Sequence, residues 1–186
     1  KREYKTKQLT IDQAKRFLWI LDHPVTVRRK EHMVKRNGKL VKIKEYEQPW
    51  SLDLKWQLFF YIALFTGARR GEIVSLLWSD IDFSQNTIHF SKSTAIVKGE
   101  VIHKETKTYA TRRCIVPDLV INTAKKLLHE QKEICLQLGD YWKGTRGKQF
   151  QDNFVFIRDD GTQMHVDSPR TEFKRVIRIY NNNIAK

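Results

Sequence analysis

Residues 54–83 read LKWQLFFYIALFTGARRGEIVSLLWSDIDF, and this stretch decides the fold. Its first part, Leu54–Phe65, is apolar on all sides of the helix that it predicts, with Ser51 as a possible N-cap. A helix of this kind has to lie in the middle of a domain. Thr66-Gly67 breaks the pattern, and a second, shorter helix is predicted from Arg69 to Trp78, with its apolar residues facing inward.

After the second helix the apolar pattern changes to a period of two, which is typical of strands. The first such run covers Ile81 to Phe90 and contains a turn at Ser84-Gln85-Asn86. A second run lies near Ile96–Ile102 and a third at Arg112–Val116. We therefore expect a small three-stranded antiparallel sheet at one edge of the domain.

Three further helices are marked by their starts. Thr10 and Gln13 form a capping-box pattern, Asp118 is suited to cap a long helix, and Ser168-Pro169 is typical of a first turn. In the last helix, four residues are predicted to face inward: Phe173, Val176, Ile177 and Tyr180. The predicted fold class is α+β, a mostly helical domain with a small three-stranded antiparallel sheet.

The composition fits one domain and a polyanionic partner. The chain has 186 residues, of which 40% are hydrophobic and 11% aromatic, and its formal net charge is +14. Residues 1–44 hold 14 basic and 4 acidic side chains, a net charge of +10, so the charge is concentrated near the start. Nucleic acid is the favoured partner. A membrane surface is the weaker alternative, because no Lys-rich amphipathic helix with an aromatic face is present in the sequence.

Much of this charge lies between Val25 and Gln48, where Lys and Arg alternate with Val, Ile and Leu around Asn37-Gly38. An Asn-Gly pair between such runs favours a two-residue hairpin turn. The segment is interpreted as a basic hairpin or mobile loop. A solvated insertion without a role is the alternative, since charge runs are often no more than that.

The remaining features indicate an intracellular setting. Cys114 and Cys135 lie in apolar patterns and predict neither a disulfide framework nor a metal site. The longest apolar run, Leu58–Phe65, is too short to span a bilayer, and no signal peptide is evident, so a cytoplasmic location is expected. Because the sequence starts with Lys1, we expect a fragment of a longer protein.

The first candidate for chemistry is Thr66-Gly67-Ala68-Arg69-Arg70-Gly71-Glu72-Ile73. Arg69 and Glu72 are three residues apart on a helix and so share a face. The Thr-Gly break lets a phosphate approach the start of the helix, where an arginine fork matches it. Alone, the pair is more often an exposed helical ion pair.

The second candidate is Thr106-Lys107-Thr108-Tyr109-Ala110-Thr111-Arg112-Arg113, a polar turn between two predicted strands. A lysine at a hairpin tip can reach a neighbouring site and carry a proton, and cationic neighbours lower its pKa. Basic hairpin tips are also often solvated, or hold DNA phosphates without chemistry.

Together, and in this order, the two motifs resemble the tyrosine recombinase or phage integrase family. That family has Thr-Gly-x-Arg-x-x-Glu after a buried helix, then Leu-x-Trp-x-Asp-Ile-Asp, which is present here as Leu76–Asp82. It continues with a Lys-Thr-x-x-Ser-x-Arg hairpin, in which Thr111 stands for the serine. The resemblance covers nearly the whole chain.

The resemblance implies strand exchange on double-stranded DNA through a 3′-phosphotyrosine, with no need for ATP or metal. By the family's motif, Arg69 would neutralise charge on the transition state, Glu72 would support that pocket, and Lys107 would be the general acid. Further DNA contacts are expected from neighbouring residues, namely Arg70, Lys104, Thr111, Arg112 and Arg113. For a full-length recombinase the family also implies a tetrameric synapse.

The sequence departs from the family pattern after the last helix. The His-x-x-Arg segment and the nucleophilic tyrosine have no match, and Tyr180 is interpreted as a core residue. We therefore expect residues 1–186 to be the first two-thirds of a catalytic domain, without the preceding DNA-clamping domain and inactive alone. A non-catalytic DNA-binding remnant or regulator is the alternative.

Overall fold

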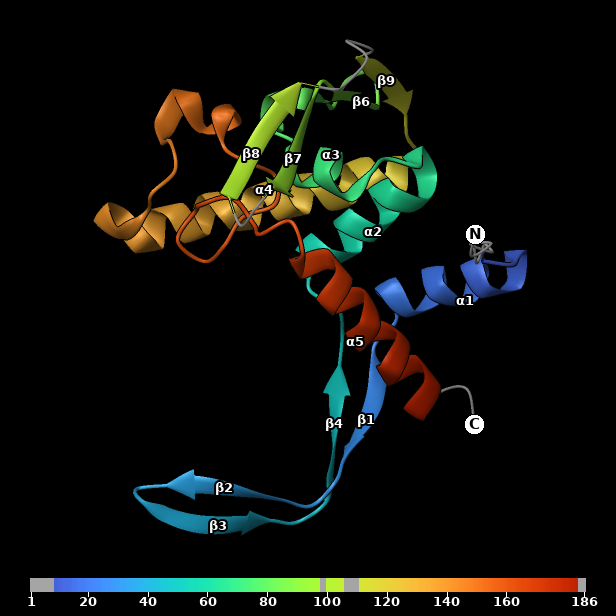
Figure 1. Ribbon diagram of the computed structural model, residues 1–186, viewed down its shortest axis with the longest axis vertical. Coiled ribbons are helices and arrows are strands. Elements are labelled where there is room, and N and C mark those ends of the chain that lie inside the picture. Colours follow the sequence, from blue (N-terminus) through green and yellow to red (C-terminus); the bar gives the residue numbers. More distant parts are fainter. Residues whose placement is uncertain (1–8, 98–99, 106–110, 184–186) are drawn as a thin grey trace. The chain divides into compact units, whose positions relative to one another are not determined.

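The computed structural model describes residues 9–97, 100–105 and 111–183, which form two compact units (Figure 1). One unit comprises the residues up to Leu52 together with those from Phe173 onward, and the other is Asp53–Glu172. Within the described residues, no helix has both the length and the apolar character needed to cross a bilayer.

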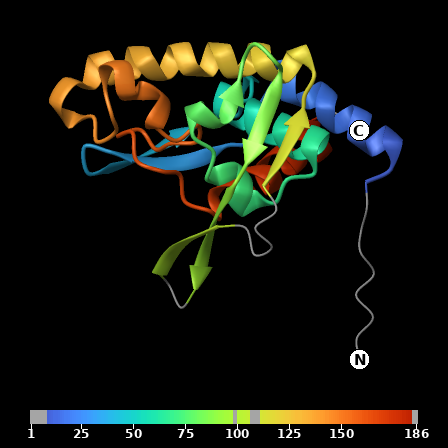
Figure 2. The same ribbon diagram turned by 90° about the horizontal axis from the view of Figure 1, so that it is seen from above.

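The larger unit is built on helix α2 (Leu54–Thr66). The helix is buried on several sides, because Leu58 and Ile62 are fully enclosed and the neighbouring aromatic side chains Phe59, Phe60 and Tyr61 are buried as well. Asp53 is the N-cap, so the prediction of Ser51 is wrong. At the other end Gly67 has a φ of 61°, a left-handed conformation that ends the helix as expected. Figures 1 and 2 show the long helix α4 (Asp118–Leu138) alongside α2.

Helix α3 (Arg70–Val74) is shorter than predicted. The chain leaves the helix because its backbone pairs with a distant segment. The Val155 N–H donates to the Leu76 carbonyl at 2.8 Å, and the Trp78 N–H donates to the Asn153 carbonyl at 3.0 Å. Trp78 instead begins the 3-10 turn η1 (Trp78–Asp80), where its indole N–H donates to Gln131 at 2.9 Å.

The predicted three-stranded antiparallel sheet is present, in the order β5 (Ile81–Asp82), β6 (Thr87–Phe90) and β9 (Arg112–Ile115). The expected run at 96–102 is not one strand of that sheet. It contains the end of β7 (Lys92–Val97) and the start of β8 (Glu100–Glu105), which pair with each other as a separate two-stranded sheet. The α+β class is confirmed.

Helix α4 follows β9, and its N-cap is Pro117 rather than Asp118. The Asp118 carboxylate instead accepts a hydrogen bond from the Asn86 amide at 2.6 Å. Beyond α4, the 3-10 turns η2 (Gly139–Tyr141) and η3 (Gly147–Asp152) enclose Trp142. Trp142 is buried and stacks on Phe150, so it is a core residue.

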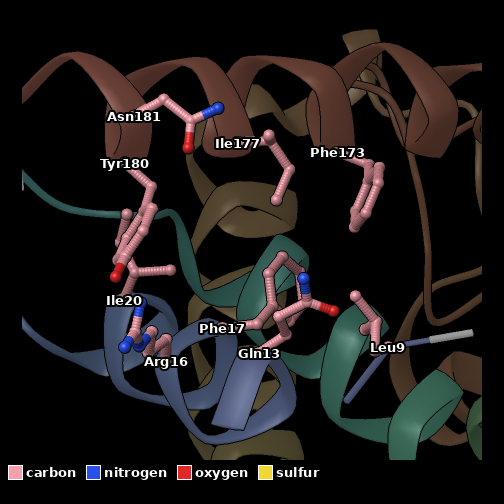
Figure 3. Close-up of a pocket in the computed structure, with 9 residues that line it drawn as sticks. All are labelled: Leu9, Gln13, Arg16, Phe17, Ile20, Phe173, Ile177, Tyr180 and Asn181. Carbon is pink, nitrogen blue, oxygen red and sulfur yellow. The ribbon is translucent and has the colours of Figure 1, made fainter. Parts of the chain in front are cut away.

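The smaller unit contains α1 (Ile11–Asp22) and the later part of α5 (Ser168–Asn183). The predicted capping box is confirmed, with hydrogen bonds of 3.2 and 3.0 Å between Thr10 and Gln13. The two helices line a pocket of about 490 Å³. Figure 3 shows Tyr180 among the residues that line it. Tyr180 is half-buried there, which agrees with a packing role, and Val176 and Ile179 are the buried positions beside it.

The basic segment of the smaller unit forms the predicted hairpin. Strands β1 (Val25–Arg29) and β4 (Tyr46–Trp50) pair at its base, and β2 (His32–Arg36) and β3 (Lys39–Ile43) pair at its end. Asn37 and Gly38 form the turn with φ values of 48° and 78°. Positive φ at both positions is what a two-residue type I′ turn requires.

Gly71 sets how closely α3 approaches β7, and this gives a first prediction. A Cβ atom at this position would lie 2.3 Å from the Thr94 carbonyl oxygen and 2.8 Å from Ser93 Oγ. Gly71→Ala should therefore lower the free energy of unfolding by about 1–3 kcal/mol in urea titrations. Adding Ser93→Ala should restore little of this loss, because the closest atom belongs to the backbone.

If Gly71→Ala were instead as stable as the wild type, the close packing of α3 on β7 would be wrong. An unhindered helical alanine would stabilise the chain by up to about 1 kcal/mol.

Candidate active site

The start of α3 holds Arg69 and Glu72, as the sequence predicts. Arg69 is the N-cap residue, and its backbone N–H donates to Glu72 Oε2 at 2.9 Å. Its guanidinium Nη1 lies 3.6 Å from the other carboxylate oxygen. The Arg69 side chain is 87% exposed, whereas that of Glu72 is 2% exposed. A buried carboxylate thus holds an arginine whose donors remain open to a ligand.

A second arginine reaches the same carboxylate from the sheet. Arg112, the first residue of β9, donates from Nη2 to Glu72 Oε2 at 2.8 Å. Its guanidinium carbon also lies 4.9 Å from the centre of the Phe90 ring, the cross-strand neighbour of Arg112. The sequence predicts Arg112 as a DNA contact and gives no sign of its contact with Glu72. Side chains alternate between the two faces of a strand, and the sequence does not say whether Arg112 or Arg113 faces α3.

The electrostatics of Glu72 follow from these contacts. Burial by itself raises the pKa of this carboxyl. The hydrogen bonds from Arg112 and from the Arg69 backbone, with the two positive charges, outweigh burial and hold the pKa below its ordinary value of 4.5. The hydrogen bond to Glu72 likewise raises the pKa of Arg112, so both groups are charged at neutral pH.

A hollow of about 450 Å³ lies next to Arg69. Arg70 forms part of its wall and is bound to Asp167, with Nη1 and Oδ1 2.8 Å apart. The other wall is β7, with Thr94 as a buried polar residue. The hollow is therefore bordered by two arginines, one of them engaged by a carboxylate.

A polar network fixes β7 to α3. Ser75 and Thr94 share a hydrogen bond of 2.7 Å between their hydroxyls. The Gln163 amide donates to Thr94 Oγ1 at 2.9 Å and to the Val74 carbonyl at 3.1 Å. These buried contacts position the hairpin of β7 and β8 beside the arginines.

The other predicted site residues are placed as follows. Lys104 lies on β8 opposite Ser93, and Thr111 is exposed just before β9. Arg113 is exposed on β9 opposite His89, and among the described residues no ion pair between it and Glu72 is found. Lys107 lies outside the described residues. Of the predicted set, the structure thus brings together Arg69, Glu72 and Arg112.

Such a cluster is suited to bind a phosphate. A guanidinium matches phosphate oxygens bidentately, and Arg69 offers its donors without having to leave a buried position. Glu72 is already paired twice, so it orients the arginines more than it repels an approaching anion.

The pKa of Glu72 leads to a second prediction. Because its folded-state pKa is lowered, its contribution to stability is present above about pH 4.5 and is lost as the pH falls through the folded-state value. Glu72→Gln should cost roughly 1–3 kcal/mol at pH 7. The difference from the wild type should shrink toward pH 3, as measured by urea unfolding at each pH.

Glu130→Gln, which alters an exposed carboxylate of α4, is the matched control and should change stability little at any pH. A Glu72→Gln difference that stayed constant from pH 7 to pH 3 would contradict the pairing of Glu72 with the two arginines.

The chain resembles proteins of one known family. A model of the phage integrase family matches residues 34–184. No curated protein sequence matches the chain. Two solved structures that it resembles are of the integrase of the Tn1549 transposon, residues 82–397, one in complex with a circular intermediate DNA and one with transposon right end DNA.

The first of these structures has a TM-score of 0.62 and 18% sequence identity over 97% of this chain and 46% of the other. The second has a TM-score of 0.62 and 20% identity over 96% and 47%. The chain thus spans about half the length of these structures, and at such identity the likeness shows a shared fold. The family model covers most of the sequence, and the chain therefore belongs to the phage integrase family of tyrosine recombinases.

Proposed function

We propose that this chain carries the Arg69, Glu72 and Lys107 part of a recombinase active site, which cleaves and rejoins duplex DNA at specific sites. The observation that carries the proposal is the exposed Arg69 guanidinium beside the buried Glu72, which also binds Arg112. The proposal is supported by the Tn1549 integrase structures, which have the same fold and are in complex with DNA.

In the proposed reaction, a tyrosine hydroxyl attacks a DNA phosphorus atom and the bond from phosphorus to the 5′-oxygen breaks. The products are a 3′-phosphotyrosine and a 5′-hydroxyl, whose proton comes from Lys107. A 5′-hydroxyl of the partner duplex then attacks the phosphotyrosine and releases the tyrosine. The number of phosphoester bonds is unchanged, so the scheme needs no external energy source.

Arg69 is proposed to act when negative charge grows on the non-bridging phosphate oxygens. Its donors are fixed at the start of α3 before the substrate arrives, which makes them effective in the transition state. Glu72 positions Arg69, and Arg112 anchors Glu72 from the sheet. Further phosphate contacts are proposed for Arg70, Lys104, Thr111 and Arg113.

The nucleophile is not assigned to Tyr180, because that ring lines the pocket between α1 and α5 (Figure 3). The substrate is double-stranded DNA, and a tetrameric synapse is proposed for the full-length recombinase. We also propose that the recombinase acts in the cytoplasm.

A second candidate function is DNA binding without cleavage. It is favoured by the net charge of +14, which suits a polyanionic partner whether or not that partner is cleaved. Cleavage assays separate the two functions, because both predict binding.

The third prediction tests the catalytic assignment in the polypeptide encoded by the complete reading frame. Arg69→Ala and Lys107→Ala should each slow cleavage of a nicked duplex substrate by about 10²- to 10³-fold, since each removes a transition-state donor. The Kd for the same duplex should change little. Covalent protein–DNA product on denaturing gels measures the rate.

Lys125→Ala, an exposed lysine of α4, is the control and should cleave at the wild-type rate. Normal cleavage by either active-site variant would refute the role assigned to that residue. A wild-type protein that binds the duplex but never forms covalent product would favour DNA binding alone.

A further inference from the structure

The end of the basic hairpin, residues 32–43, forms a ribbon of two strands with little packing of its own. Figure 1 shows β2 and β3 as a ribbon that continues beyond β1 and β4 within the smaller unit. Both of its faces are largely exposed, and Leu40 and Met33 are 70% and 55% exposed. A two-stranded hairpin alone is marginally stable in water. The ribbon therefore presents a surface that the smaller unit does not use for its core.

The charges of the hairpin are arranged differently at its base and at its tip. At the base, Arg28 pairs with Glu45, and at the inner end of the ribbon Lys42 pairs with Glu31 at 2.9 Å. Residues 32–43 hold four basic residues and no acidic one. Three of them, Lys35, Arg36 and Lys39, form no ion pair with any other residue that the structure describes. The tip thus carries uncompensated positive charge.

The register makes this arrangement unfavourable for the hairpin itself. Arg36 lies directly opposite Lys39, beside the Asn37-Gly38 turn. Like charges that face each other across two strands destabilise a hairpin. A partner that supplies negative charge would offset this repulsion, which points to an anionic ligand at the tip.

The placement of the three cations also indicates the shape of that ligand. Cross-strand partners share a face, so Arg36 and Lys39 lie on one face, and Lys35, opposite Leu40, lies on the other. Cations on both faces of a ribbon can contact phosphates on both walls of a groove. The major groove of B-DNA, about 12 Å wide, admits a two-stranded ribbon.

We propose that the ribbon of residues 32–43 is a second DNA-binding element, which enters the major groove and holds backbone phosphates through Lys35, Arg36 and Lys39. The inference rests on the DNA substrate of the proposed function but adds a contact apart from the Arg69 cluster. Phosphate contacts of this kind add affinity and position the duplex without reading its sequence.

The test is the salt dependence of binding, measured by fluorescence anisotropy with a labelled 30-base-pair duplex in 50–300 mM KCl. Each phosphate contact contributes about 0.9 to the slope of log K against log salt. The triple variant Lys35→Gln/Arg36→Gln/Lys39→Gln should lower the magnitude of that slope by about 2 to 3. A control with the same loss of charge, Lys125→Gln/Lys126→Gln/Lys132→Gln on the exposed side of α4, should lower it by much less.

Thermal unfolding of the ribbon variant shows whether a change in binding comes from a folding defect. The ribbon variant should melt at or above the wild-type temperature, because it removes the repulsion between Arg36 and Lys39. An unchanged salt slope, or an equal loss in the α4 control, would overturn the proposal. So would a ribbon variant with a lower melting temperature, because its cations would then be structural.

Two further outcomes distinguish a failure of the ribbon proposal from a failure of the proposed function. If the wild-type chain fails to bind the duplex even at 50 mM KCl, the DNA substrate of the proposed function is wrong as well. If it binds and the ribbon variant alters self-association in sedimentation experiments but not the salt slope, the ribbon contacts a second copy of the chain and the proposal fails alone.

Discussion

The buried carboxylate of Glu72 is the constraint on which the site depends. A charge without access to water is costly unless it is paired and hydrogen-bonded. Glu72 meets this requirement with the Arg69 backbone on its own helix and with Arg112, which is 40 residues further along the chain. One group therefore joins the start of α3 to the edge of the sheet. Arg69 gains a fixed position from this pairing while its side chain stays exposed.

Packing of the surrounding elements holds α3 and β7 in position around Arg69 and Glu72. The apolar helix α2 supplies the core against which α4 lies, and the left-handed Gly67 ends α2 so that α3 can start in a new direction. Gly71 lets β7 approach α3 closely, and the hydrogen bonds of Thr94 fix that contact. The cations follow a related rule. Arg112 is paired where it supports the fold, whereas Arg69 and the cations of the ribbon tip are open where an anion is proposed to bind.

The sequence by itself determined those features that depend on neighbours along the chain. The Thr10 capping box, the apolar helix ended by Gly67, the Asn37-Gly38 turn and the period-two runs at 81–90 and 112–116 are local patterns, and the structure has all of these. The proximity of Arg69 and Glu72 is local too, because one turn of helix separates them. The resemblance to the family rests on such local motifs, and the match to the family model confirms it.

Tertiary structure decided what depends on partners distant in sequence. The end of α3 before Trp78 is set by backbone hydrogen bonds from the segment around Val155, which no local signal in α3 records. The division of the 96–102 run between two strands depends on which segments pair with each other. The choice of Arg112 over Arg113 as the partner of Glu72 depends on which face of β9 packs toward α3. Because side chains alternate along a strand, Arg112 and Arg113 must point to opposite faces of the sheet. Only the packing of the sheet decides that Arg112 is the one that faces Glu72.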